Sequence, residues 1–164
     1  MQGEYRRLIE LFAEKVREGL QGTITSMALY GSVARATARP ESDVDFLLVG
    51  TSLSPHYHER LNLLLPIIDC VEASGAYREL EQKGYVPTIR VVVYDRKEAR
   101  KTKPLFLDLV EDAVILFDDG FLRAKLDEIR RRMGELGSRR VLLPEGRWYW
   151  DLKPDLKPGE VFEI

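Results

Sequence analysis

The sequence of 164 residues has one cysteine and two histidines, which limits the chemistry that it can carry. A lone cysteine cannot form an internal disulfide, and Cys70 lies among apolar residues, so we expect it to be a small buried hydrophobic residue. His56 and His58 are two residues apart near the start of an expected helix, where they do not face each other. Without a further cysteine or histidine cluster they cannot complete a zinc site, and neither has the neighbours of a hydrolase triad. We expect both to be exposed to solvent.

Long apolar runs and an excess of one charge are also missing. No apolar run is long enough to cross a bilayer, and the first residues are too charged for a secretory signal. The 25 basic and 27 acidic residues give a net charge of -2, whereas a non-specific nucleic-acid binder has a basic excess. No Walker loop or dinucleotide fingerprint occurs. We expect a cytoplasmic protein that binds neither membranes nor nucleic acid. A basic cluster at 130–132 and 139–140 nevertheless leaves an RNA acceptor open. The oligomeric state is also left open.

The residues that are present suit one domain over residues 1–164, since 45% are hydrophobic and no linker interrupts the chain. In a long helical segment, Ser54 is the expected N-cap, Pro66 a bend and Gly75 an interruption. Apolar spacing predicts helices over 4–20, 54–83 and 122–136, helical turns over 32–38 and after Asp95 and Pro104, and strands over 24–30, 44–49, 88–94 and 114–117. The fold class is therefore α+β, a small mixed β-sheet with helices packed against it.

The last part of the chain, 138–164, differs in character from the rest. The tetrapeptide Asp-Leu-Lys-Pro occurs at 151–154 and again at 155–158, and prolines four residues apart exclude a helix. We therefore expect an extended C-terminal strap. Within it, Arg147 to Trp150 alternates like a strand, so Trp148 and Trp150 share one face. They are expected to pack on the core or the last helix, with a partner surface as the alternative.

The stretch from Tyr30 to Gly50 combines features of a phosphate site. A strand ends at Gly31, and a helix is expected to begin at Ser32. Glycine lets the backbone approach a ligand closely, and the first N–H groups of a helix favour an anion such as a nucleotide phosphate. The Ser32 hydroxyl can donate a further hydrogen bond, and Arg35 or Arg39 can add a positive charge.

Two carboxylates follow the expected phosphate site. Asp43 and Asp45 are two residues apart at the start of the next strand, so both side chains project from the same face. Neighbouring carboxylates repel each other unless a cation lies between them, and a hard divalent ion is the natural candidate. Together with a phosphate site, this arrangement suits metal-assisted phosphoryl transfer.

The motif in this stretch resembles the signature of the DNA polymerase beta-like nucleotidyltransferase superfamily, in particular its minimal single-domain prokaryotic members. It consists, in this order, of Gly31-Ser32, Ala34-Arg35 and Ser42-Asp43-Val44-Asp45. Segments 105–118 and 148–163 are also similar to the C-terminal half of archaeal members. The resemblance implies a nucleotidyltransferase fold and transfer of a nucleoside monophosphate from a triphosphate, with ATP expected, to a hydroxyl. It implies Mg²⁺, with Mn²⁺ as the alternative, on Asp43 and Asp45, and a nucleotide bound by Gly31, Ser32, Arg35 and Ser42.

The sequence departs from that signature at two positions. Members of the family have a glycine after the arginine of the first motif, and Ala36 stands there. Active members also take a third carboxylate from a neighbouring strand, whereas the expected strand over 88–94 has no acid and carries Arg90 near the equivalent position. An arginine there can reach Asp43 or Asp45 and neutralise them as a metal would.

Other acids are poor replacements for the missing carboxylate. Asp95 lies five residues after Arg90, about 16 Å along a strand, and points to the opposite face. Asp69 and Glu72, on the helix before the third strand, could supply the third carboxylate instead, but the sequence gives no geometric basis for choosing either. We therefore keep two functions open. The first is a nucleotidyltransferase, which the resemblance implies can act as the antitoxin of a helical HEPN-type partner protein. The second is a catalytically degenerate module of the same fold that binds nucleotide or a partner.

Overall fold

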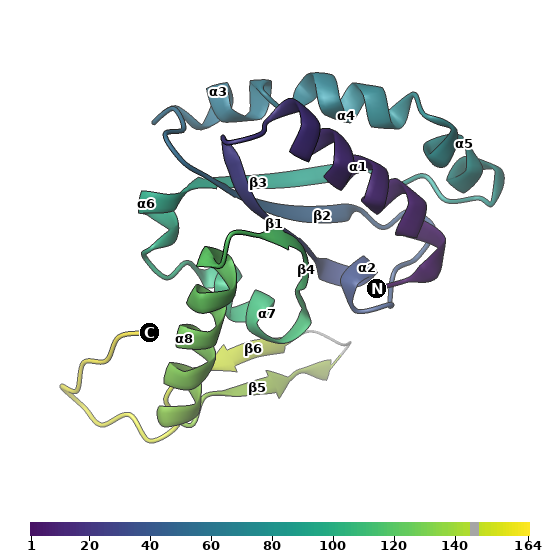
Figure 1. The fold of residues 1–164 in the computed structure, drawn as a ribbon. Helices are drawn as coiled ribbons and strands as arrows, with labels where there is room; N and C mark the ends of the chain where they lie inside the picture. The colour runs from purple at the N-terminus through teal and green to yellow at the C-terminus, as the bar shows by residue number, and fades with distance from the viewer. Residues whose placement is uncertain (145–147) are drawn as a thin grey trace.

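The computed structural model describes residues 1–144 and 148–164, and its centre is a four-stranded mixed sheet (Figure 1). The strand order is β3-β2-β1-β4, so β3 and β4 are the edges. β1 pairs antiparallel with β2 and with β4, and β2 pairs parallel with β3. The strands are β1 Ile24–Tyr30, β2 Val44–Gly50, β3 Ile89–Asp95 and β4 Val114–Asp118, which confirms the four predicted strands to within one residue at each end.

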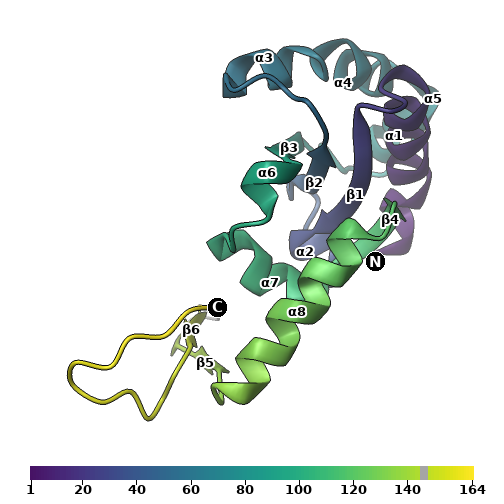
Figure 2. The same ribbon diagram turned by 60° about the vertical axis from the view of Figure 1, so that its left-hand side comes forward.

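Helices cover both faces of this sheet. α1, α4 and α5 lie on one face, and α7 and α8 lie on the other (Figures 1 and 2). A single turn, α2, follows β1, and another, α6, follows β3. The helices are η1 Gly3–Tyr5, α1 Arg6–Gly19, α2 Gly31–Ala34, α3 Tyr57–Asn62, α4 Leu65–Glu72, α5 Gly75–Gln82, α6 Arg96–Ala99, α7 Pro104–Asp112 and α8 Phe121–Glu135. This arrangement confirms the predicted α+β class.

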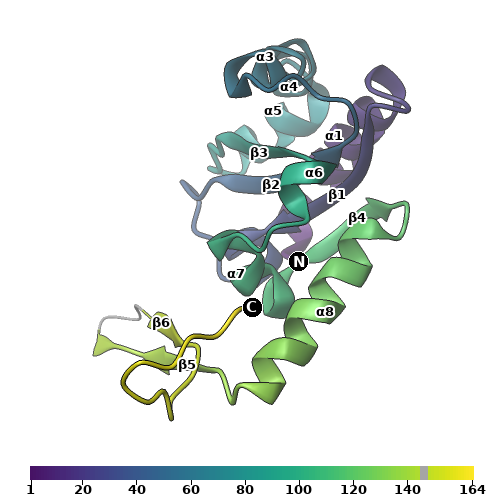
Figure 3. The same ribbon diagram turned by 90° about the vertical axis from the view of Figure 1, so that its left-hand side faces the viewer.

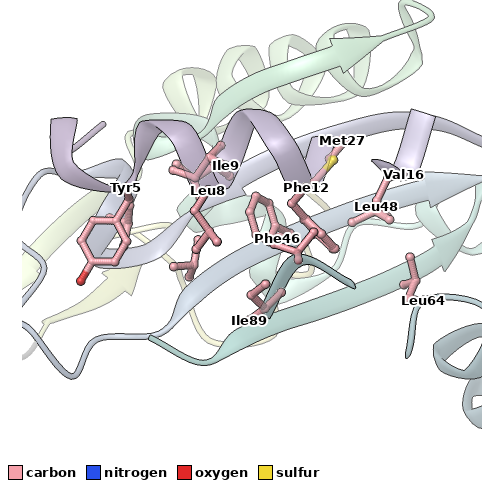
Figure 4. Close-up of a cluster of buried hydrophobic side chains, with 14 of the residues drawn as sticks. Tyr5, Leu8, Ile9, Phe12, Val16, Met27, Phe46, Leu48, Leu64 and Ile89 are labelled. Carbon is pink, nitrogen blue, oxygen red and sulfur yellow. The ribbon is translucent and has the colours of Figure 1, made fainter. Parts of the chain in front are cut away.

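Strand β2 is buried on both faces because its side chains alternate between two cores. Phe46 and Leu48 point toward α1, where the rings of Phe12 and Phe46 lie 4.7 Å apart (Figure 4). Leu47 and Val49 belong to the second core, under α7 and α8. Asp45 has the same parity as Leu47 and Val49, so its side chain lies on the α7–α8 side of the sheet.

The segment over 54–83 is three helices. The interruption predicted near Gly75 is confirmed, since α4 ends at Glu72 and α5 begins at Gly75, but Ser54 is not an N-cap. The first helix, α3, begins at Tyr57 with His56 at the N-cap, while the Ser54 hydroxyl accepts a hydrogen bond from the His56 N–H at 3.1 Å. Pro66 lies in the first turn of α4, where proline is tolerated, and does not bend a continuous helix. Both histidines are exposed, as predicted.

Cys70 is exposed, so the prediction that it is buried is wrong. Helix α4 turns Ile67, Ile68 and Val71 toward α1 and the sheet. Cys70 is about 110° from the centre of that face at 100° per residue, and its side chain therefore reaches solvent. Apolar neighbours in sequence do not imply burial when the helix is covered on one side.

The C-terminal segment contains a β-hairpin that the sequence did not indicate in full. β5, Arg139–Leu142, pairs antiparallel with β6, Trp148–Asp151, and residues 152–164 contain no helix or strand. Trp148 and Trp150 share a face, as predicted, with their rings 6.2 Å apart. Trp150 donates a hydrogen bond from Nε1 to Asp108 of α7 at 3.0 Å, which fixes the hairpin on that helix. Arg147, the first residue of the predicted strand, lies outside the described residues.

Within the described parts of the chain, none of the helices combines the length and the apolar character that crossing a membrane requires.

Candidate functional site

Three neighbouring strands place one residue each in a row across the sheet. In the register of the ladders, Tyr30 of β1 is opposite Asp45 of β2, and Asp45 is opposite Arg90 of β3. Side chains in such a row lie on the same face, with adjacent strands about 4.8 Å apart. Asp43 lies two residues before Asp45, immediately before β2 begins. We call Asp43 and Asp45 the aspartate pair.

The carboxylate of Asp45 lies against the turn that follows β1. Gly31 has φ +76°, and a Cβ added to it would overlap with Oδ2 of Asp45 and lie 3.3 Å from its Cγ. Only glycine fits a left-handed backbone in such close contact with another group. The structure therefore brings Asp45 next to Gly31 and Ser32, which we call the glycine–serine corner.

The helical turn after this corner is shorter than predicted. α2 ends at Ala34, whereas the sequence predicted helical turns over 32–38. The Thr37 N–H donates to the Ser32 carbonyl at 2.9 Å, and Ala36 between them has φ +58°. This left-handed residue ends the turn, and it explains physically why a glycine suits the position after Arg35.

We expect Ala36→Gly to stabilise the protein by about 0.5–1 kcal/mol. A left-handed conformation costs a non-glycine residue about 1–2 kcal/mol, and the extra freedom of glycine in the unfolded chain offsets only part of that gain. Urea denaturation of both proteins measures the difference. Ala13→Gly in the middle of α1 is the control, and there the same exchange should destabilise by about 1 kcal/mol. A loss of stability in Ala36→Gly would contradict the left-handed assignment.

The loop before the aspartate pair is held by its own hydrogen bonds. The Ser42 hydroxyl accepts from the Arg39 N–H at 2.9 Å, and the Ser42 N–H donates to the Arg39 carbonyl at 3.0 Å. The Tyr5 hydroxyl donates to the same carbonyl at 3.1 Å. Ser42, a predicted nucleotide ligand, therefore has a structural role in presenting Asp43.

Arg35, the other predicted phosphate ligand, is paired with α7. Its Nη1 lies 3.4 Å from Oδ2 of Asp112, and the same carboxylate oxygen is 3.2 Å from Nη2 of Arg140. The guanidinium of Arg140 lies over the rings of Trp148 and Trp150, with its Cζ 4.6 Å and 5.4 Å from their centres. To contact a phosphate at the glycine–serine corner, Arg35 would have to leave Asp112.

Arg90 makes the contact that the sequence predicted. Its Nε lies 3.0 Å from Oδ2 of Asp43, and the two side chains are 65% and 27% exposed. A guanidinium thus lies beside the aspartate pair. Active members of the superfamily that the motif resembles have a third carboxylate at this place.

No further acid joins the aspartate pair within residues 1–144 and 148–164, since no group of three or more His, Cys, Asp or Glu there is arranged to hold a metal ion. Asp95 is 8% exposed, and its carboxylate accepts hydrogen bonds from the N–H groups of Leu53 and Lys97. It caps α6, so it is a structural residue. Asp69 and Glu72 lie on α4, which packs on the opposite face of the sheet.

Burial and like charge act together on Asp45. Burial, followed by the charge of Asp43, raises the pKa of the Asp45 carboxyl, while Arg90 and Arg35 act in the opposite direction. Burial, with Asp45 as the second cause, also raises the pKa of Tyr30 to about 12. Tyr30 is therefore a neutral phenol at physiological pH beside a carboxylate that is costly to ionise.

We expect Asp45→Asn to stabilise the metal-free protein at neutral pH by roughly 0.5–1 kcal/mol. A raised pKa means that folding disfavours the ionised carboxylate, and the amide removes this cost above the pKa. The gain should shrink as the pH falls through the pKa of Asp45, because the wild-type carboxyl then becomes neutral as well. Denaturation of both proteins in EDTA across this pH range is the measurement. A destabilised variant at neutral pH would show that Asp45 serves the fold.

Comparison with known proteins gives one family. Residues 9–143 match the family described as nucleotidyltransferase domain. No protein of curated function matches the chain in sequence.

Solved structures that match the chain have low sequence identity. Spectinomycin adenyltransferase AAD(9) from Enterococcus faecialis, solved with ATP and spectinomycin, has a TM-score of 0.53 and 13% identity over 80% of this chain and 66% of that chain. A complex of tri-AMPylated HEPN toxin with MNT antitoxin from Shewanella oneidensis has a TM-score of 0.42 and 12% identity over 82% of this chain and 90% of that one. At such identities AAD(9) supports the fold alone.

Proposed function

Because the chain belongs to the nucleotidyltransferase domain family, we propose that it transfers a nucleoside monophosphate from a nucleoside triphosphate, with ATP as the expected donor, to a hydroxyl acceptor. One observation carries the proposal: the carboxylate of Asp45 lies directly against Gly31, so that the aspartate pair and the glycine–serine corner border the same space. Phosphate-binding groups and metal ligands have to meet in this way for phosphoryl transfer.

Each group in this space has a role that its chemistry supports. Backbone N–H groups of the glycine–serine corner and the Ser32 hydroxyl would donate to phosphate oxygens. The aspartate pair would hold Mg²⁺, or Mn²⁺, which when bound neutralises the charge of the triphosphate. Mg²⁺ is commonly held by one or two carboxylates together with substrate phosphates, so the pair fits one ion that arrives with the nucleotide.

A second ion does not fit in the same way, because Arg90 stands where a third carboxylate is needed. Its ion pair with Asp43 is largely exposed and is worth about 0–1 kcal/mol, so a nucleotide with its metal can displace it. The released guanidinium can then donate to a phosphate oxygen and stabilise the charge that develops during transfer.

The same contact favours a second candidate function. A guanidinium that neutralises the aspartate pair permanently would leave a module that binds nucleotide, or a protein partner, without transfer. This module differs from the enzyme in one step only, since the glycine–serine corner is unchanged. The fate of the α-phosphate therefore separates the two functions.

We propose a HEPN-type helical protein as the acceptor and partner. This proposal rests on the resemblance of the Gly31 to Asp45 motif to minimal members of the superfamily, for which the chain would act as the antitoxin. An RNA acceptor is the competing possibility.

The test is incubation with ATP labelled on the α-phosphate, Mg²⁺ and either a HEPN-type protein or RNA. Transfer of label that is lost in Asp45→Asn and kept in Asp69→Asn, an exposed carboxylate on α4, supports the enzyme and identifies the acceptor class. ATP that stabilises the protein without label transfer supports the binding module. Absence of both effects contradicts a nucleotide site at the aspartate pair.

A further inference from the structure

A pocket of about 620 Å³ lies beyond α6 and shares no residue with the glycine–serine corner or the aspartate pair. It is bounded by the α6–α7 connection, by one side of α8 and by the last residues of the chain, which double back toward α7 (Figures 1 and 3). Five of the residues that line it are basic: Arg100, Lys101, Lys125, Arg131 and Arg132.

Three of these basic groups form ion pairs with two carboxylates. The Lys125 side chain is 9% exposed, and its ammonium lies 3.2 Å from the Glu128 carboxylate. Arg131 and Arg132 both contact Glu135, at 2.5 Å and 3.2 Å. These pairs build the wall of the pocket, and their charges are largely compensated.

The other two basic groups are available to a ligand. Within the residues that the structure describes, Arg100 and Lys101 are exposed and form no ion pair. Thr102 beside them adds a hydroxyl to the lining. The tail that closes the pocket is fixed by a hydrogen bond from Arg132 Nε to the Glu163 carbonyl at 2.9 Å. The rim of the pocket thus carries two basic groups without an ion-pair partner in the described chain, while the carboxylate of Glu163 also belongs to the lining.

The floor of the pocket is formed by two apolar residues, of which Ile164 is the accessible one. Ile129 is 1% exposed and belongs to the core under α8, and Ile164 packs against the same core. A ligand for this pocket needs a flat or apolar part for the floor and an anion for the rim. Its volume lies within the range of about 300–1,000 Å³ that is typical of small-molecule sites.

We propose that this pocket is a second binding site, for a nucleoside phosphate. The phosphate groups would contact Arg100 and Lys101, and the base or ribose would lie on the partly exposed side chain of Ile164. Guanidinium and ammonium groups are the usual donors to phosphate, and the apolar floor distinguishes a nucleoside phosphate from a bare anion. A free nucleotide and the end of an RNA strand both present this chemistry.

The two sites differ in their need for metal. A triphosphate at the aspartate pair requires a cation between the carboxylates and the phosphates, whereas the rim of the pocket supplies its own positive charge. Binding in the pocket should therefore persist in EDTA and weaken as salt is added. The inference stands even if no nucleotidyl transfer occurs.

The experiment is calorimetric titration of the full chain in EDTA at low ionic strength, with ATP, tripolyphosphate, a short oligoribonucleotide and an acidic peptide as probes. We expect ATP to bind wild type and Asp45→Asn equally. Arg100→Glu and Lys101→Glu should weaken binding by at least about tenfold, since each removes a charge-assisted hydrogen bond. Lys97→Glu, an exposed charge reversal on α6 outside the lining, should change it by less than about threefold.

The probes separate the sources of the ligand. Tighter binding of the oligoribonucleotide than of ATP assigns the pocket to RNA, and the reverse assigns it to a free nucleotide. Tripolyphosphate or the acidic peptide binding as tightly as ATP would overturn the proposal, as would no binding of any nucleoside phosphate in EDTA or equal affinity in Lys101→Glu. Protection of the Lys101 amine from acylation by bound ATP gives a second readout that needs no variant.

Discussion

Gly31→Ala should abolish the expected stabilisation of the protein by Mg²⁺ and ATP and lower its free energy of unfolding by about 1–2 kcal/mol. The backbone at Gly31 has φ +76°, and the new methyl group would overlap with Oδ2 of Asp45. The carboxylate can rotate away, so the clash itself costs the fold little, but it removes a metal ligand from the glycine–serine corner. A ligand at a hundred times its dissociation constant stabilises a protein by about 2.7 kcal/mol, which is the effect expected to disappear.

Gly22→Ala is the matched control for this prediction. Gly22 has φ +77°, nearly the same backbone, and nothing lies within 4 Å of the position that its Cβ would take. Both variants should lose similar stability, but only Gly31→Ala should lose the response to nucleotide. In an Asp45→Ala background, where the clash is absent, the two glycine substitutions should have equal effects on stability. An unchanged nucleotide response in Gly31→Ala would contradict a site at this corner.

Arg90→Asp should create a site that binds a metal ion without nucleotide, which we expect the wild-type aspartate pair to do only weakly. Position 90 is opposite Asp45 on the parallel neighbour strand, so a carboxylate there would lie beside the aspartate pair. Three carboxylates without a cation repel each other, and the variant should be less stable than wild type in EDTA. Mn²⁺ without nucleotide should then stabilise it by about 2–3 kcal/mol at a hundred times the dissociation constant.

The control for that prediction is Arg90→Gln, which removes the guanidinium without adding a ligand. Thermal denaturation of both variants and of wild type over a series of Mn²⁺ concentrations gives the comparison. Wild type and Arg90→Gln should respond weakly. If Arg90→Asp responds no more than Arg90→Gln, the side chain at position 90 does not face the aspartate pair.

Local patterns in the sequence were sufficient for the sheet. Four apolar runs bounded by turn residues predicted β1 to β4, and the resemblance to the superfamily placed Arg90 near the aspartate pair, where its contact with Asp43 is found. The helical layer was less predictable. The separation of α3 from α4 was not predicted. The exposure of Cys70 depends on which side of α4 meets α1, and no local pattern contains that information.

Contacts over long separations account for most of what sequence reasoning missed. Arg35 pairs with Asp112, which is 77 residues away, and the stacking of Arg140 on Trp148 requires the hairpin, whose strand β5 has no distinctive alternation. The basic pocket combines α8 with two segments that only the tertiary fold brings together. Short-range features such as the cap formed by Asp95 were recognisable because they depend on neighbouring residues.

A crystal structure of the protein soaked with a non-hydrolysable ATP analogue and Mn²⁺ decides whether the aspartate pair and the glycine–serine corner form a nucleotide site. We expect the phosphates at the N–H groups of Gly31 and Ser32, Mn²⁺ in contact with oxygens of Asp43 and Asp45, and Arg90 displaced from Asp43. A triphosphate bound away from Ser32, or an ion that neither aspartate contacts, would contradict the proposed chemistry.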